Sequence, residues 1–215
     1  MNRAHNAVQA RKGLELALLY FDNITMDLIY GTPGLTNDKW QRNVETALAL
    51  NIPHLSCYAL TVEPQTPLDK LIRLNKKDDV NPDTQSEQFL LLMGWLRAAG
   101  YEHYEISNFA KPGFRSRHNS SYWQGKPYVG IGPSAHSFNG TERRWNIANN
   151  QQYIDAIAKG VAPVEKELLT PVQQINESIM ISLRTVEGVD LTRFSEGAAR
   201  QLVKAVQKYI NRACL

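Results

Sequence analysis

The sequence predicts an α/β fold in which parallel strands alternate with crossover helices, followed by a smaller α-rich unit. Two observations predict it. Up to about residue 110, short apolar runs closed by turn residues alternate with amphipathic runs at helical spacing, as in strands joined by helices. Beyond Phe138, helical runs are instead separated by prolines. We therefore expect an α/β part over residues 1–160 and the start of a helical domain over 161–215.

The α/β part contains three predicted helix–strand pairs. Helices are expected over about 6–21, 37–51 and 83–99, and strands over 24–30, 54–62 and 103–109. Thr36 or Asn37 can cap the second helix, and Asp83 or Thr84 the third, because their side chains accept hydrogen bonds from free backbone N–H groups. The polar segment 67–83 predicts a surface excursion. Strict alternation of helix and strand favours parallel pairing.

The remaining part is predicted to be helical. A short helix is expected over 153–160, and Thr170 opens another with a proline at its first position. A short element over 191–194 and a last helix over 196–210 complete this unit, which reads as small and α-rich.

Composition excludes several classes of function. The 215 residues are 43% hydrophobic and 21% charged, with a net charge of +3. Lysine and arginine are scattered, so nucleic acid is not an expected partner. Cys57 and Cys214 lie too far apart in sequence to act as a ligand pair. With no apolar run long enough to cross a bilayer and no signal-peptide core near Met1, we expect a cytoplasmic protein.

The segment 117–138 carries the greatest concentration of specialised side chains. If His118 lies on a helical turn, Tyr122 four residues later shares its face. An imidazole beside the rings of Tyr122 and Trp123 could bind the metal of a large planar cofactor while the rings stack on it. Spacing alone leaves a second interpretation open, in which the aromatic residues are core and His118 is structural.

Charged residues near this segment and in the strands are further candidates. The cations around His118 are Lys111, Arg115, Arg117 and Lys126. They could hold the carboxylates of an anionic ligand, or belong to a solvated loop. Asp27 interrupts an apolar strand, where a carboxylate needs a partner: a ligand hydroxyl or ammonium, or a salt bridge to a helix. Glu105 faces either the interior of a barrel or solvent.

Other chemistries lack support. Ser134 is not within a Gly-x-Ser-x-Gly elbow. The glycine spacing of the turn 31–34 does not match a nucleotide-binding fingerprint. His54 and His103 have no partner at ligand spacing, which favours structural roles.

Seven motifs in one order give the chain a resemblance to a known family. They are Arg3-Ala4-His5-Asn6, Asp27-Leu28-Ile29-Tyr30-Gly31-Thr32-Pro33-Gly34, Tyr58-Ala59-Leu60-Thr61-Val62-Glu63-Pro64-Gln65-Thr66-Pro67, Tyr104-Glu105-Ile106-Ser107-Asn108-Phe109-Ala110, His118-Asn119-x-x-Tyr122-Trp123, Gly130-Ile131-Gly132-Pro133-Ser134-Ala135-His136 and Leu183-Arg184-Thr185-Val186-Glu187-Gly188-Val189. Over essentially its entire length the chain resembles radical S-adenosylmethionine proteins similar to oxygen-independent coproporphyrinogen III oxidase. The His-Asn-x-x-Tyr-Trp motif makes it most like their haem-chaperone branch.

The resemblance implies a fold and a set of site residues. The fold is the later part of a radical-SAM partial (β/α) barrel, followed by an incomplete, α-rich C-terminal domain. Matching positions imply S-adenosylmethionine contacts for Arg3, Asp27, Thr61 and His136. The haem motif implies haem contacts for His118, Asn119, Tyr122 and Trp123, with His118 as a ligand of the haem iron. Haem or porphyrin, and a haem-accepting protein, are the implied partners.

The sequence departs from the family at the iron–sulfur cluster. The family holds a 4Fe-4S cluster in a Cys-x-x-x-Cys-x-x-Cys loop, and this sequence has none. We expect the first barrel strands to be missing and the chain alone to be inactive in radical chemistry. Exposed barrel edges would then favour a homo-oligomer.

Three functions are open from the sequence. The first is part of a radical-SAM haem chaperone that binds haem and S-adenosylmethionine. The second is part of an oxygen-independent coproporphyrinogen III dehydrogenase. The third, of another class, is a non-catalytic, shortened binding or scaffold protein.

Overall fold

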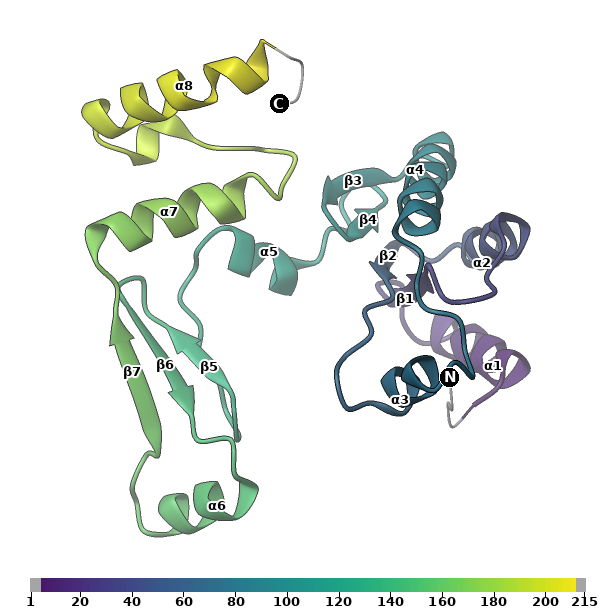
Figure 1. The fold of residues 1–215 in the computed structure, drawn as a ribbon, viewed down its shortest axis with the longest axis horizontal. Coiled ribbons are helices and arrows are strands. Elements are labelled where there is room, and N and C mark those ends of the chain that lie inside the picture. Colours follow the sequence, from purple (N-terminus) through teal and green to yellow (C-terminus); the bar gives the residue numbers. More distant parts are fainter. Residues whose placement is uncertain (1–4, 212–215) are drawn as a thin grey trace. The chain divides into compact units, whose positions relative to one another are not determined.

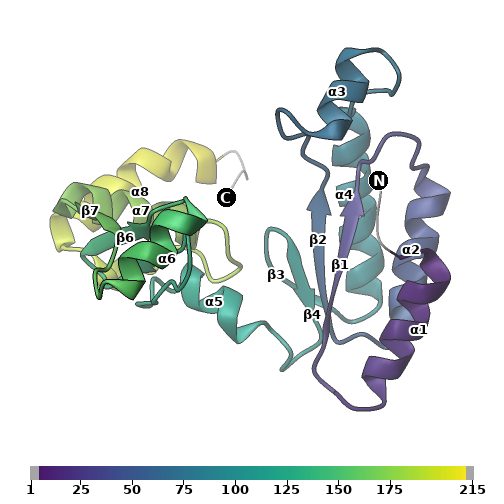
Figure 2. The same cartoon turned by 90° about the horizontal axis from the view of Figure 1, so that it is seen from below.

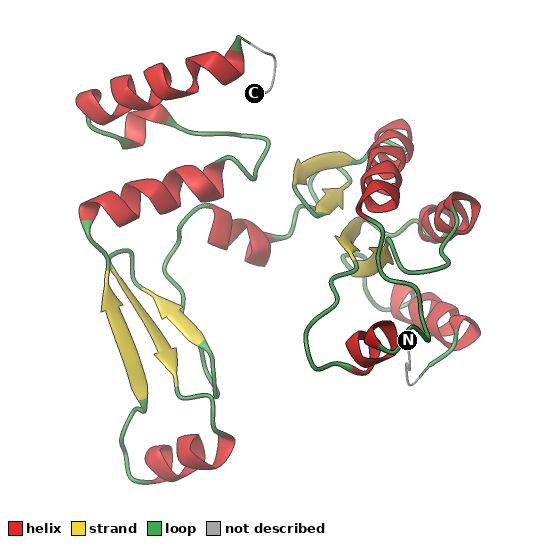
Figure 3. Ribbon diagram, in the orientation of Figure 1, coloured by secondary structure: helices red, strands yellow, loops and turns green. Residues whose placement is uncertain are grey.

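The computed structural model describes residues 5–211, which form two compact units divided between Ser116 and Arg117. Figures 1 and 3 show the course of the chain and its helices and strands. Each unit is described by itself.

A four-stranded sheet forms the centre of the first unit, in the order β1-β2-β4-β3. Its strands are β1 (Thr25–Tyr30), β2 (His54–Ala59), β3 (Glu102–Glu105) and β4 (Asn108–Ala110). β1 and β2 are parallel, as predicted, and their arrows run side by side in Figure 2.

The prediction of one parallel strand over 103–109 was wrong. This segment is a hairpin, in which β4 pairs antiparallel with both β2 and β3. The turn at Ile106 and Ser107 reverses the chain, so β4 lies between β2 and β3. Because two antiparallel steps restore the direction, β3 runs the same way as β1 and β2. The second predicted strand is also shorter than 54–62 and ends at Ala59.

Helices cover one face of this sheet: α1 (Ala7–Leu18), α2 (Asn37–Ala49) and α4 (Pro82–Ala98). A further helix, α3 (Pro67–Arg73), lies beyond the ends of β1 and β2 (Figure 2). Thr36 caps α2 as predicted, whereas Asn81 rather than Asp83 or Thr84 caps α4. Pro82 then takes the first helical position, where its missing N–H costs nothing. α3 lies within the segment predicted as a polar excursion, capped by Thr66.

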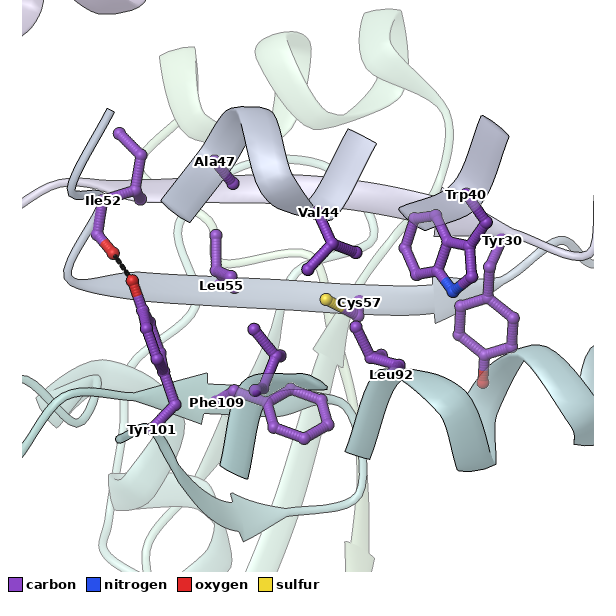
Figure 4. Packing of buried hydrophobic residues seen from close by; sticks show 11 residues of the cluster. Tyr30, Trp40, Val44, Ala47, Ile52, Leu55, Cys57, Leu92, Tyr101 and Phe109 are labelled. Carbon is purple, nitrogen blue, oxygen red and sulfur yellow. Dashed lines mark hydrogen bonds between the residues drawn. The ribbon is translucent and has the colours of Figure 1, made fainter. Parts of the chain in front are cut away.

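The core of the first unit lies between the sheet and α2 and α4. Leu55 and Cys57 of β2, and Phe109 of β4, point toward the helices and are buried, as are Trp40 and Leu92 (Figure 4). Successive strand residues point to opposite faces. Asp27 and Ser56, which are paired in register, therefore lie on the other face of the sheet.

The second unit contains a three-stranded antiparallel sheet that the sequence did not predict. Its strands are β5 (His136–Phe138), β6 (Glu142–Asn146) and β7 (Val164–Leu168), in the order β5-β6-β7. β7 adds a strand to the part beyond residue 161, which was expected to be small and α-rich. Charged residues on these strands, such as those of Glu-Arg-Arg-Trp-Asn in β6, hide the apolar alternation on which strand prediction depends.

Helices accompany this second sheet. They are α5 (Arg117–Trp123), α6 (Asn150–Ala158), α7 (Pro171–Ser182), the short 3-10 helix η1 (Leu191–Arg193) and α8 (Glu196–Ile210). α6 connects β6 to β7 at one end of the sheet, and α7 follows β7 at the other (Figure 1). Thr170 caps α7 with Pro171 at its first position, as predicted. The predicted boundary after residue 160 separates two domains of the family, whereas the division after Ser116 separates two compact units. The boundary after residue 160 therefore stays a prediction.

Candidate functional site

The motif His118-Asn119-x-x-Tyr122-Trp123 forms α5, one of the short helices of the second unit. Residues four apart lie on one face of a helix, and the Tyr122 hydroxyl is 3.2 Å from Nε2 of His118. The two rings meet edge to face, with centroids 5.1 Å apart. Both side chains are exposed. Within residues 5–211 no hydrogen bond reaches Nδ1 of His118. The exposed imidazole is therefore oriented by the contact at Nε2, and Nδ1 is accessible to a ligand.

Trp123 closes the motif with an unsatisfied donor. Its indole N–H is buried and has no hydrogen-bond partner among the described residues. The guanidinium of Arg184 lies over the indole ring, 5.2 Å from its centroid, and restrains it through a cation–π contact. A buried donor without a partner costs about 1–3 kcal/mol. Such an atom fits a position that acquires a polar partner when a ligand binds.

Further rings extend from Tyr122. The Tyr128 ring contacts Tyr122 edge to face at 4.9 Å, and Phe138 of β5 lies 6.1 Å from Tyr128. Asn119, half-buried, lies on the same helix as His118. All four predicted haem residues therefore lie on the short helix α5, and the rings of Tyr128 and Phe138 lie next to it.

A cavity of about 690 Å³ opens beside this motif within the second unit. Tyr122 and Trp123 line one side, and α7 lines another through Ile175, Met180 and Ile181. The sequence predicted α7 and a short element at η1, but it did not assign either of them to a site. Their cavity-lining residues follow ordinary helical spacing, which gives no signal of a site.

His136 lies at the start of β5, beyond the loop 130–135. The loop is fixed by Asn146, whose side-chain amide donates to the carbonyl of Gly132 at 2.8 Å. Gly130 approaches the His136 backbone so closely that any Cβ would overlap it. His136 itself is exposed, with its ring near that of Trp145. The predicted cofactor histidine is thus held by a rigid turn.

Asp27 and Thr61 belong to the first unit. Asp27 is exposed on the sheet face opposite the helices, and no ion pair to a helix forms within residues 5–211. Thr61 is exposed two residues beyond β2. The strand pairing continues through Leu60, whose N–H donates to the Tyr30 carbonyl. Thr61 is five residues beyond Ser56, the strand partner of Asp27, so at about 3.3 Å per residue the two are roughly 16–17 Å apart along the strands.

A hydrogen-bond network lies on the same face as Asp27. His54 is buried, with Nδ1 2.7 Å from the Thr25 hydroxyl and Nε2 2.7 Å from the Tyr104 hydroxyl. Burial lowers the pKa of His54, and the Asp27 carboxylate opposes this effect. The structural role predicted for His54 is confirmed. His103 stacks on Phe109 with centroids 4.2 Å apart, which also confirms a structural role.

Glu105 does not face solvent. It is paired with Asn108, whose neighbour Phe109 points toward the helices, so Glu105 lies on the opposite face of the sheet. It is buried, and its carboxylate accepts from the amide of Asn108 and from the Ser107 N–H. The Asn108 side-chain oxygen is buried without a partner among the described residues. Glu105 therefore stabilises the turn of the hairpin.

The cysteines do not fit a cluster site. Cys57 is buried under the helices, where loss of solvent, followed by the Asp27 carboxylate, raises its pKa to about 12. Cys214 lies outside the described residues. Within residues 5–211 no group of three His, Cys, Asp or Glu side chains is arranged to hold a metal.

The four predicted S-adenosylmethionine residues are distributed along the chain. Asp27 and Thr61 belong to the first unit and His136 to the second, and Arg3 lies outside the described residues.

Gln88 is a buried residue that sequence reasoning missed. Its side chain accepts from the Gly31 N–H at 2.8 Å and donates to the Leu35 carbonyl at 2.9 Å, fixing the turn after β1. In the sequence, this role could have been indicated only by the position of a glutamine on the apolar face of a predicted helix.

Comparison with known proteins gives the relationship. No family model matches the chain. The haem chaperone HemW of Bacillus subtilis is 37% identical over 183 residues, covering 85% of this chain and 48% of the relative. HemW of Mycobacterium tuberculosis is 33% identical over 208 residues, covering 96% and 53%. The solved structure of coproporphyrinogen III oxidase (HemN) from Escherichia coli, a radical SAM enzyme, has a TM-score of 0.66 at 20% identity, covering 86% of this chain and 45% of that one.

The fold resembles part of the fold of this radical S-adenosylmethionine enzyme, as the sequence predicted. In sequence, the chain is related to the haem chaperones named HemW over most of its length. It spans about half the length of these curated relatives. Among the helices in the described part of the chain, none is long and apolar enough to cross a membrane.

Proposed function

We propose that this chain carries the haem-binding segment of a radical-SAM haem chaperone, with His118 as the iron ligand. One observation carries the proposal: the exposed imidazole of His118 has Nε2 bonded to Tyr122, and Nδ1 has no partner in residues 5–211. A histidine that ligates a metal through one nitrogen is commonly oriented by a hydrogen bond at the other. Tyr122 supplies that bond, which makes Nδ1 the ligating atom.

The neighbouring residues support a planar ligand. The rings of Tyr122 and Tyr128 offer apolar contact next to His118, and the unsatisfied Trp123 N–H offers a donor. Asn119 shares the helix and is proposed as a further haem contact. The names of the similar proteins, haem chaperones, support haem as the ligand proposed here.

S-adenosylmethionine is proposed as the second cofactor. Asp27 has a solvent-facing carboxylate suited to a ligand hydroxyl or ammonium, and Thr61 follows the neighbouring strand. Arg3 and His136 remain proposed contacts on the strength of the motifs alone. In whole radical-SAM proteins a 4Fe-4S cluster supplies the electron that cleaves this cofactor. The residues of this chain do not fit such a cluster, so we expect no 5′-deoxyadenosine from the chain with dithionite; its formation would contradict this.

A second function is favoured by one observation. The solved structure with a similar fold is a coproporphyrinogen III oxidase, so part of such a dehydrogenase is the alternative enzyme. Binding of haem through His118, in preference to coproporphyrinogen III, separates the chaperone from it. The third hypothesis, a non-catalytic scaffold, predicts that the chain binds neither haem nor coproporphyrinogen III.

Partners and location follow the same proposal. A haem-accepting protein is the proposed partner, and the cytoplasm the proposed location. β1 pairs only with β2 within the described residues, so one of its edges is free. A free edge favours self-association, which sedimentation velocity would detect; a monodisperse monomer would contradict it.

A haem titration followed at the Soret band tests the main proposal. The chain should show saturable binding, and His118→Ala should weaken it at least tenfold and change the band position. His5→Ala, which removes another exposed imidazole, is the matched control and should bind like the unaltered chain. Identical titrations for His118→Ala and the unaltered chain would overturn the proposal.

A further inference from the structure

We infer that the cavity beside α5 and α7 binds the carboxylate-bearing edge of a porphyrin, with Lys126 and Arg193 as the carboxylate partners. This inference rests on the proposed haem-binding function and adds to it the recognition of the ligand's two acid groups. It concerns the second unit alone.

The cavity has the size and lining of a cofactor site. Its volume of about 690 Å³ is within the usual range of small-molecule pockets, roughly 300–1,000 Å³. Aromatic rings of Tyr122, Tyr128 and Phe138 form one wall, and aliphatic side chains of α7 form another. A pocket lined largely by aromatic and aliphatic side chains favours a hydrophobic ligand.

The charges lining the cavity favour an anion. The charged residues that line it are Lys126, Arg143, Arg193 and Glu177. Arg143 is bonded to Glu177 at 2.8 Å, so these two charges offset each other. Lys126 and Arg193 form no ion pair within residues 5–211. Arg193 does interact electrostatically with the nearby Asp190 carboxylate. Two cations that make no salt bridge of their own still match a ligand with two carboxylates.

The turn at the end of α5 places Arg193 close in space to the residue that precedes Lys126. Gly125 has φ +65°, and its N–H bonds to the Tyr122 carbonyl while the Lys126 N–H bonds to Ser121. This pattern is a Schellman motif, which ends the helix and directs the next residue away from it. A guanidinium nitrogen of Arg193 lies 3.9 Å from where a Cβ on Gly125 would be. Arg193 and Lys126 therefore flank one turn.

Trp123 adds a third group to this edge. It precedes the turn by two residues, lines the cavity and carries the buried N–H that lacks a partner in the described part of the chain. His118 lies one turn of α5 before Tyr122, whose ring borders both the imidazole and the cavity. One ligand large enough to reach from His118 to the Gly125 turn would use all of these groups.

Metal-free protoporphyrin IX tests the inference without iron ligation. Its binding, followed by fluorescence, should be compared with that of its dimethyl ester, which has the same ring but no free carboxylates. We expect the unaltered chain to bind the diacid at least tenfold more tightly than the ester. Equal affinity for the two ligands, or no binding of the diacid, would overturn the inference without requiring any variant.

Charge-neutralising variants locate the carboxylate partners. Lys126→Gln and Arg193→Gln should each weaken diacid binding roughly tenfold and leave ester binding unchanged. Lys159→Gln, an exposed lysine of the same unit outside the cavity, is the matched control. Unchanged diacid affinity in both cation variants would contradict the assignment.

The outcome is independent of the iron ligand. His118→Ala should keep its affinity for metal-free protoporphyrin IX while losing the haem spectrum. If haem titrates identically with and without His118 but the diacid preference persists, the iron-ligand proposal fails and the cavity inference stands. If haem binding depends on His118 but the chain binds the diacid no more tightly than the ester, the cavity inference fails and the iron-ligand proposal stands.

Discussion

The phenolic oxygen of Tyr122 lies 3.2 Å from Nε2 of His118, one helical turn earlier on α5. This contact fixes an imidazole that is otherwise exposed and leaves Nδ1 open. The position of the tyrosine in the motif therefore has a physical meaning besides ring stacking: it sets which nitrogen faces a ligand.

Tyr122→Phe should weaken haem binding without abolishing it. The ring contacts remain, whereas the hydrogen bond to His118 is lost. A hydrogen bond of this kind contributes about 1 kcal/mol, or roughly fivefold in the dissociation constant. A Soret titration measures the effect, and a change as large as that of His118→Ala would show that the hydroxyl, not the imidazole, is the main contact.

Gln88→Leu should destabilise the first unit by about 2–4 kcal/mol. The substitution leaves the buried Gly31 N–H and Leu35 carbonyl without partners, each at a cost of about 1–3 kcal/mol. Urea denaturation measures this loss. Gln41→Leu, an exposed glutamine on α2, is the matched control and should change stability by less than about 0.5 kcal/mol. Equal stabilities of the two variants would contradict the role of Gln88.

The elements that the sequence predicted well have strong local signals. Thr36 and Thr170 are side-chain caps, and Pro171 marks the first helical position. Such signals depend on a few neighbouring residues, so they survive without knowledge of the tertiary structure. The same holds for α5, where the four-residue spacing of His118 and Tyr122 predicted a shared face and the structure confirms it.

The hairpin of β3 and β4 could not be predicted from such local signals. Ser107 and Asn108 lie within a run of strand-forming residues, and neither Gly nor Pro marks the reversal. The reversal depends on the buried Glu105 carboxylate, which accepts from Ser107 and Asn108. Lys126 was named from the sequence as a possible carboxylate partner, but Arg193 was not, because Arg193 meets the Gly125 turn only through folding of the chain over 68 residues.

Gly130→Ala should destabilise the second unit by about 1–3 kcal/mol, the usual cost of forcing extra atoms into a packed site. A Cβ at this position would overlap the His136 backbone, which cannot move aside as a flexible side chain could. Thermal denaturation measures the loss. Gly197→Ala is the control, because that helical glycine has open space around it, and alanine there should raise stability by about 0.5–1 kcal/mol. Destabilisation by Gly197→Ala, or none by Gly130→Ala, would contradict the packing.

His54 should make the first unit less stable as the pH falls below about 6.5. Burial lowers its folded-state pKa from that ordinary value, and Asp27 only partly opposes the shift. Between the two pKa values the unfolded chain binds a proton that the folded chain does not, so the free energy of unfolding decreases with falling pH. One proton gives a slope of at most about 1.4 kcal/mol per pH unit. Above pH 6.5 both states are neutral at His54, and the slope from this residue vanishes.

His54→Gln should remove this slope while costing stability at neutral pH. The variant cannot reproduce both bonds, to Thr25 and to Tyr104, so a loss of about 1–3 kcal/mol is expected at pH 7.5. The gap between the variant and the unaltered chain should then narrow as the pH falls to 5, because only the unaltered chain is penalised by protonation. Urea denaturation across that range measures the gap. A constant gap would show that His54 titrates alike in both states, and His5→Ala, an exposed histidine, should leave the slope unchanged.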